Sequence, residues 1–78
     1  MTAFSKLRQD LAAADRHIAE GQARIAQQAD VVCALDADGH DTTDAQNLLR
    51  VMQESLDAMN AQRQQIVRAL TCAPAEQR

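Results

Sequence analysis

The side chains of this sequence that could carry chemistry are two histidines, two cysteines and a cluster of acidic residues near the middle of the chain. The segment Asp36-Ala37-Asp38-Gly39-His40-Asp41 offers the carboxylate oxygens that Ca²⁺ prefers. An EF-hand loop with Gly39 at its sixth position, however, would have Ala34 at the first position and Ala45 at the twelfth, where carboxylates are required. The segment is therefore better explained as a turn with solvated acids than as a calcium site.

A second candidate is the pair His17 and Glu20, whose spacing of three residues places both on one helix face. Such a pair can bind a divalent metal when facing helices supply further ligands. The residue expected opposite them is about Gln62, so we expect no metal site and no cofactor within one chain. The alternative function is a small regulatory or sensory module that binds a divalent metal across a dimer interface, through His17 and Glu20 or through His40 and Asp41.

Nothing in the sequence indicates an active site. There is no Gly-rich phosphate loop, and neither Cys33 nor Cys72 has a histidine placed to activate it. The two cysteines are expected near opposite ends of the fold, too far apart for a disulfide. We therefore expect free thiols and no enzyme activity.

The elements that carry these residues are two long runs of helical periodicity. The pattern predicts a single domain over 1–73, with one helix over 3–38, a turn over 39–42 and a second helix over 43–72. Pro74 is expected to end the second helix and leave 74–78 as a frayed tail. Alternate spacings of three and four residues, the heptad pattern of a coiled coil, define one seam on each helix. The seam residues are Phe4, Leu7, Leu11, Ala14, Ile18, Gly21, Ile25, Gln28, Val32 and Leu35, followed by Ala45, Leu49, Met52, Leu56, Met59, Arg63, Ile66 and Leu70.

Folding the second run back on the first fixes a register. It pairs Gly21 with Met59, a small residue against a large one, so the helices should approach closely there. Arg63 would lie in the seam, where an unpaired guanidinium is costly, and is expected to turn toward Asp15. Gln28, the other polar seam residue, is interpreted as a further device that sets the register.

The turn has its own stop and start signals. Gly39 can adopt the left-handed conformation that ends a helix. Thr43 and Gln46 have the spacing of a capping box for the second helix, and Asp41 or Thr42 is the alternative cap.

Small and apolar residues also form a stripe beside the seam on each helix. By wheel geometry these stripes fall on opposite flanks of the hairpin. We interpret them as surfaces for self-association or for a partner protein, the alternative being that Ala only raises helix propensity. The expected interface residues are Ala12, Ala19, Ala26 and Cys33 on the first helix and Leu48, Val51 and Ala58 on the second.

Composition limits the remaining choices. The 78 residues include one Phe and no Trp or Tyr, which supplies little core volume. The net charge of −3, with Lys and Arg scattered singly, argues against nucleic acid as a partner. No apolar run reaches the length of about 18 residues that would cross a bilayer, so we expect no membrane partner and a cytoplasmic location.

The chain contains the segments Arg16-His17-Ile18-Ala19-Glu20-Gly21 with Arg24-Ile25-Ala26, Gly39-His40-Asp41-Thr42, and Leu48-Leu49. In these segments, over about residues 15 to 70, it resembles a group of short uncharacterised proteins from proteobacteria. In topology alone the chain also resembles the plasmid-encoded Rop hairpin, two copies of which form a four-helix bundle, and the similarity includes Leu35-Asp36-Ala37-Asp38 at the bend. The aromatic and basic face with which Rop binds RNA has no counterpart here, and the proteobacterial group brings no known activity.

The sequence therefore predicts an all-α, two-helix antiparallel coiled-coil hairpin that completes a helical bundle by self-association. Its expected role is that of a non-enzymatic bacterial protein acting through protein–protein interaction, as a homo-oligomer, with a dimer favoured, or on a protein partner.

Overall fold

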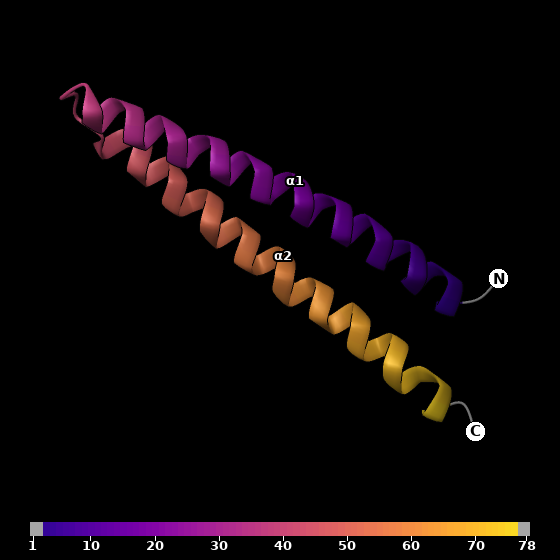
Figure 1. The fold of residues 1–78 in the computed structure, drawn as a ribbon. Helices are drawn as coiled ribbons and strands as arrows, with labels where there is room; N and C mark the ends of the chain where they lie inside the picture. Colours follow the sequence, from indigo (N-terminus) through magenta and orange to yellow (C-terminus); the bar gives the residue numbers. More distant parts are fainter. Residues whose placement is uncertain (1–2, 77–78) are drawn as a thin grey trace.

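The computed structural model describes residues 3–76, with side chains described for 3–71, and consists of two long helices joined by a short turn (Figure 1). Helix α1 spans Ala3–Ala37 and helix α2 spans Thr43–Glu76. The helices run antiparallel, so the turn lies at one end of the molecule and both ends of the chain lie at the other. The predicted all-α helical hairpin is confirmed.

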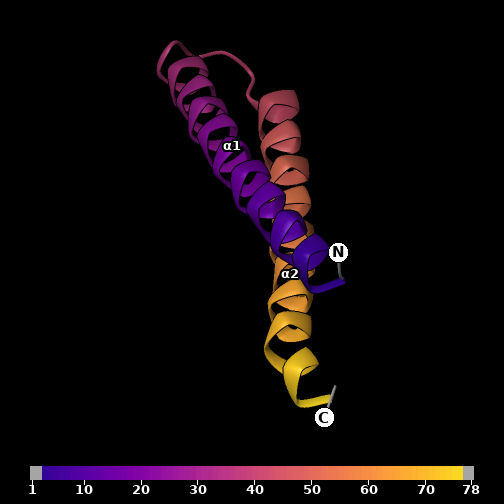
Figure 2. The same ribbon diagram turned by 90° about the vertical axis from the view of Figure 1, so that its right-hand side faces the viewer.

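The hairpin is a rod. It measures 63 × 15 × 12 Å, and the view along the other axis shows α1 and α2 crossing at an angle (Figure 2). Its radius of gyration is 17.9 Å, whereas a compact chain of this length has a radius of about 11.5 Å. Neither helix, over the residues described, combines the length and the apolar character needed to span a bilayer.

The core is the seam predicted by the heptads. Every residue expected in that seam is partly or fully shielded from solvent. Ile18, near the middle of α1, is 8% exposed and is the one buried residue among those whose side chains are described. The predicted seam is therefore present, but it consists of a single layer of side chains.

Both helices end at positions different from those expected. α1 ends at Ala37, one residue earlier than predicted. α2 does not end before Pro74 but continues through it to Glu76, so the expected frayed tail is wrong for 74–76 and lies outside the described residues for 77 and 78. The φ angle of proline is close to the helical value, so the backbone can stay helical past Pro74 while losing one bond to the carbonyl of Leu70.

Gly39 ends α1, as predicted. Its φ of 78° lies in the left-handed region, where a glycine is unstrained. The His40 N–H donates to the Leu35 carbonyl at 2.9 Å, and the Gly39 N–H donates to the Asp36 carbonyl at 3.0 Å. This pair of bonds is the Schellman motif, which satisfies carbonyls that the end of a helix leaves unpaired.

The start of α2 differs from the expected capping box. The Asp41 Oδ1 atom accepts hydrogen bonds from the Thr43 N–H at 2.9 Å and from the Thr43 hydroxyl at 2.7 Å, while the Gln46 N–H donates to the Thr42 carbonyl at 2.8 Å. Asp41, named above as an alternative, is thus the capping side chain, and Thr43 is a donor to it. A carboxylate two residues upstream can reach this N–H, and its charge suits the positive end of the helix.

The close approach of the helices at Gly21 is also confirmed. A methyl carbon placed on Gly21 would lie 3.2 Å from the Met59 Cε atom and 3.4 Å from the Leu56 Cδ1 atom. These contacts are tight, but both neighbours are the far ends of flexible side chains.

The Asp41 cap predicts a pH-dependent contribution to stability. The hydrogen bonds from the Thr43 hydroxyl and N–H lower the pKa of Asp41 below its usual 3.8. A lowered pKa stabilises the folded state above pH 3.8, and this contribution disappears as the pH falls through the folded-state pKa. We expect Asp41→Ala to lower the melting temperature at neutral pH, with the difference shrinking in acid. Asp41→Asn, which keeps an acceptor without a charge, should show a smaller and pH-independent deficit, and an Asp41→Ala deficit that is equal at both pH values would contradict the assignment.

The Gly21 contact predicts opposite effects for two substitutions. Gly21→Ala should stabilise the hairpin by up to about 0.5–1 kcal/mol, because it removes a helix-interior glycine and the Met59 methyl can move aside. Gly21→Leu should destabilise it by about 1–3 kcal/mol, because the larger side chain forces the helices apart. Urea melts followed by circular dichroism at one fixed protein concentration measure both changes. If Gly21→Leu melts like the parent chain, the helices do not approach closely at this residue.

Candidate protein-interaction face

The seam divides the hairpin surface into two broad faces. One, here called the Val51 face, contains two hollows that open between the helices. The opposite face, here called the Asp15 face, carries Asp15 of α1 and, on α2, Gln64, Val67 and Thr71 beside the seam residue Arg63. The hollows of the Val51 face are lined by Gly21, Arg24, Val51, Met52, Ser55 and Met59, and nearer the chain ends by Asp10, Ala13, Ala14, His17, Gln62 and Ile66.

The large exposed hydrophobic residues of the described chain gather near the turn. They are Val31, 45% exposed, and Leu48 and Val51, each 51% exposed. The heptad register places Val31 and Leu48 at the same level on either side of the seam, and Val51 is one turn of α2 away. Single exposed hydrophobic residues are ordinary. These three share one face and lie beside a hollow lined by Met52 and Met59, so together they form an apolar patch.

Charge is unevenly distributed on the Val51 face. The flank of α2 that borders it has no charged residue from Leu48 to Ala69. Its members are Leu48, Val51, Ser55, Ala58, Gln62, Gln65 and Ala69. The corresponding flank of α1 carries Lys6, Asp10, His17, Glu20 and Arg24. Lys6 and Asp10 form an ion pair of 3.1 Å near the chain ends, far from the apolar patch.

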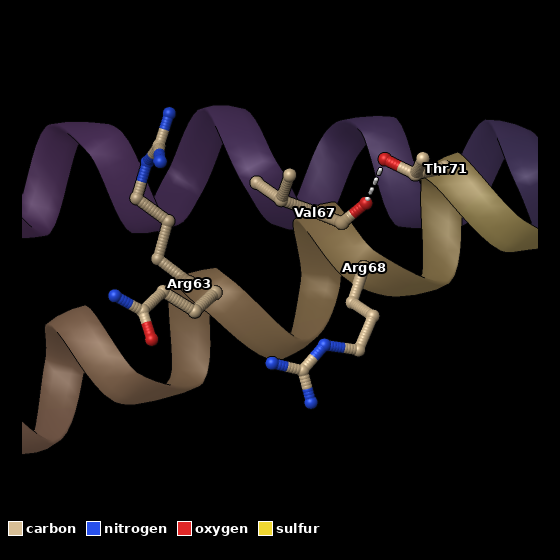
Figure 3. Close-up of a pocket in the computed structure, with 5 residues that line it drawn as sticks. Arg63, Val67, Arg68 and Thr71 are labelled. Carbon is tan, nitrogen blue, oxygen red and sulfur yellow. Dashed lines mark hydrogen bonds between the residues drawn. The ribbon is translucent and has the colours of Figure 1, made fainter.

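The Asp15 face is built around the polar seam residue Arg63. Its guanidinium Nε donates to the Asp15 carboxylate, as predicted. This face also has a hollow, lined by Arg63, Gln64, Val67, Arg68 and Thr71. Figure 3 shows Arg63 and Val67 directed toward α1 and Arg68 directed away from it, beside the bond from the Thr71 hydroxyl to the Val67 carbonyl. The Arg63 side chain is 38% exposed, so its charged end reaches solvent while its stem covers the seam.

The other polar seam residue, Gln28, also finds a partner. Its side-chain amide donates to the Ala45 carbonyl of α2 at 3.0 Å. The Gly21–Met59 contact supports the register expected from the sequence, whereas the Gln28 amide reaches Ala45, one heptad nearer the turn than Met52, the residue that this register places opposite Gln28.

All seven residues expected at a partner interface are exposed, but the structure does not bring them together. Leu48, Val51 and Ala58 border the Val51 face, while the helical repeat places Ala12, Ala19, Ala26 and Cys33 toward the Asp15 face. The thiol of Cys33 is free, and the side chain of Cys72 lies outside the described residues.

Sequence reasoning missed Val31. Its signal was present as a second β-branched residue directly before the seam residue Val32. Val31 becomes part of an apolar patch only in the folded hairpin, because folding places Leu48 of α2 at the same level along the rod.

The candidate metal residues are not joined by other ligands. His17 and Glu20 are exposed, and His17 shares the outer hollow with Asp10 and Gln62. Over the described part of the chain, no group of three His, Cys, Asp or Glu side chains is arranged to hold a metal ion. The carboxylate of Asp41 is engaged by Thr43. The alternative of a shared metal would thus need ligands from a second copy.

Comparison of the chain with protein-family models, with curated proteins and with solved structures finds no match. The fold and its surface define the class of the protein as a two-helix hairpin.

The Arg63–Asp15 pair predicts a small, specific coupling. Asp15→Ala should cost up to about 1 kcal/mol, the range of partly exposed ion pairs, because Arg63 then lies in the seam without its partner. In an Arg63→Met background, where the seam residue is apolar, the same substitution should have almost no effect. Urea denaturation of the four chains gives the coupling energy. An equal cost of Asp15→Ala in both backgrounds would contradict a pairwise interaction.

Proposed function

We propose that this chain is a non-enzymatic helical-hairpin protein that acts through protein–protein interaction, by self-association, by docking on a partner protein, or by both. Association of two copies would complete a four-helix bundle. The observation that carries the proposal is how little a single hairpin buries.

The exposed surface is large for the mass of the chain. The hairpin exposes 5736 Å², whereas a compact monomer of 8.5 kDa exposes about 4,650 Å². The excess of about 1,000 Å² is similar to the share of about 800 Å² that each partner contributes to a standard protein interface. One further protein surface placed along the rod would therefore bring its burial into the range of ordinary domains.

The seam cannot supply the missing core. Ile18 is the one buried residue among the described side chains, and its neighbours in the seam are only partly shielded from solvent. A single small core of this kind contributes only a few kcal/mol of net stability, about 3–5 at most. A second layer of helices would cover the outer sides of these same residues and increase that contribution.

The non-enzymatic part of the proposal is supported by the openness of the groups that could react. Cys33, His17 and His40 are all exposed on a two-helix rod, without the water-excluded surroundings in which catalytic groups are tuned. The cytoplasmic location expected from the sequence belongs to the same proposal, and the free thiol of Cys33 is compatible with a reducing compartment.

Self-association predicts a concentration-dependent mass. Sedimentation equilibrium should give about twice the chain mass of 8.5 kDa at tens of micromolar, falling toward one chain on dilution. The melting temperature should rise with protein concentration, because two copies fold together. A chain that stays monomeric, fully helical and equally stable across this range would rule out self-association and leave docking on a different protein.

A further inference from the structure

We propose that two copies of this chain meet through their Val51 faces with both turns at the same end of the bundle, so that α1 of each copy packs on α2 of the other. This inference rests on the proposed self-association and specifies its face and its orientation.

The choice of face follows from which groups on each face would lose contact with water when a second copy covers it. The Val51 face presents Val31, Leu48 and Val51 half-exposed, and the α2 flank beside them is uncharged as far as Ala69. The Asp15 face instead carries the partly exposed Arg63–Asp15 ion pair. Covering that pair would remove water from a charged group that lies in the seam itself. The Val51 face also has an ion pair, Lys6–Asp10, but it lies near the chain ends, and covering the apolar patch removes hydrocarbon from water.

The two copies must overlap along the whole length of the rod, because one face has little more area than a stable interface needs. The rod is 63 Å long and 15 Å across, which offers about 950 Å² per copy. A stable interface needs about 800 Å² per partner. A dimer that overlapped over only half of the rod would fall well short, so the patch near the turn and the polar half near the chain ends must both be covered.

Two symmetric arrangements give full overlap. If the turns lie at opposite ends, each α1 packs on the α1 of the second copy, and the middle of α1 meets its own symmetry mate. That middle is Glu20, so two like charges face each other, and Val31 is set against the Lys6–Asp10 ion pair of the other copy. Both contacts are unfavourable.

If the turns lie at the same end, each α1 packs on the uncharged flank of the other α2. Val31 then meets Leu48 and Val51 of the second copy, and every apolar side chain of the patch is covered by the same patch. Glu20 and Arg24 of α1 face Ser55, Ala58 and Gln62, so neither meets a like charge on the α2 that covers it. Glu20 and Arg24 are four residues apart, the favourable order for pairing along their own helix.

The exposed thiol of Cys33 provides the test of orientation. A spin label on Cys33, in a Cys72→Ser chain, lies 13 residues beyond Glu20 and so about 20 Å from the middle of the rod. Dipolar distance measurements should give about 30 Å or less between the two labels if the turns lie together. With the turns at opposite ends the labels would be about 40 Å or more apart.

Matched carboxylate variants test the face. Val51→Asp and Val31→Asp should each raise the dimer dissociation constant on the order of a hundredfold, because the symmetry places the new charge in the apolar interface twice. Ala26→Asp, at an exposed position toward the Asp15 face, is the control and should leave the constant unchanged within about twofold. Sedimentation measures the constants, and circular dichroism at high concentration compares helix content.

The outcomes separate this inference from the proposal beneath it. A short Cys33 distance with loss of dimer in both valine variants supports the arrangement. A dimer with a label distance of 40 Å or more overturns the orientation, and a dimer that survives Val51→Asp but is lost in Ala26→Asp overturns the face. In both of those cases self-association itself stands, whereas a parent chain that is monomeric and fully helical at about 100 μM overturns both.

Discussion

The structure depends on a seam that is narrow because only two helices form it. Each helix can bury one stripe of side chains against the other. Because two helices meet only along a line, solvent still reaches both sides of that stripe. Gly21 opposite Met59 brings the backbones together, and Ile18 one turn away is the one described residue that reaches full burial. The elongated shape and the large exposed surface both follow from this one-layer core.

Specificity along such a seam comes from its interruptions. A uniform apolar stripe could slide by a heptad with little loss, because the same residue types would meet again. The Arg63 guanidinium is satisfied only in the alignment that places it beside Asp15, and the Gln28 amide adds a bond between the helices to the Ala45 carbonyl. The turn adds a second constraint, because the Gly39 stop and the Asp41 cap define where the chain reverses. These polar groups thus contribute alignment at positions where they add little apolar burial.

The two faces of the hairpin differ in what they offer a partner. The Val51 face combines an apolar patch near the turn with an uncharged flank of α2, and the Asp15 face combines small side chains with a bridging ion pair. On the Val51 face the charged residues lie on the flank of α1, and they suit a second copy only where α1 meets α2. The choice of face is therefore coupled to the direction in which the two rods lie. The proposed interaction therefore depends on the chemistry of these two surfaces.

The sequence by itself determined the two helices, their antiparallel pairing, the seam, the Gly39 stop and the two contacts Gly21–Met59 and Arg63–Asp15. These follow from spacing alone, because helical periodicity fixes which residues share a stripe and a short turn fixes which stripes meet. The tertiary structure decided the rest. It chose the Asp41 carboxylate over the side chain of Thr43 as the cap, carried α2 past Pro74, and made an apolar patch of Val31 with Leu48 and Val51. Capping competes among neighbouring acceptors at nearly equal energy, and a residue beside the seam becomes part of a surface only through what the other helix places next to it.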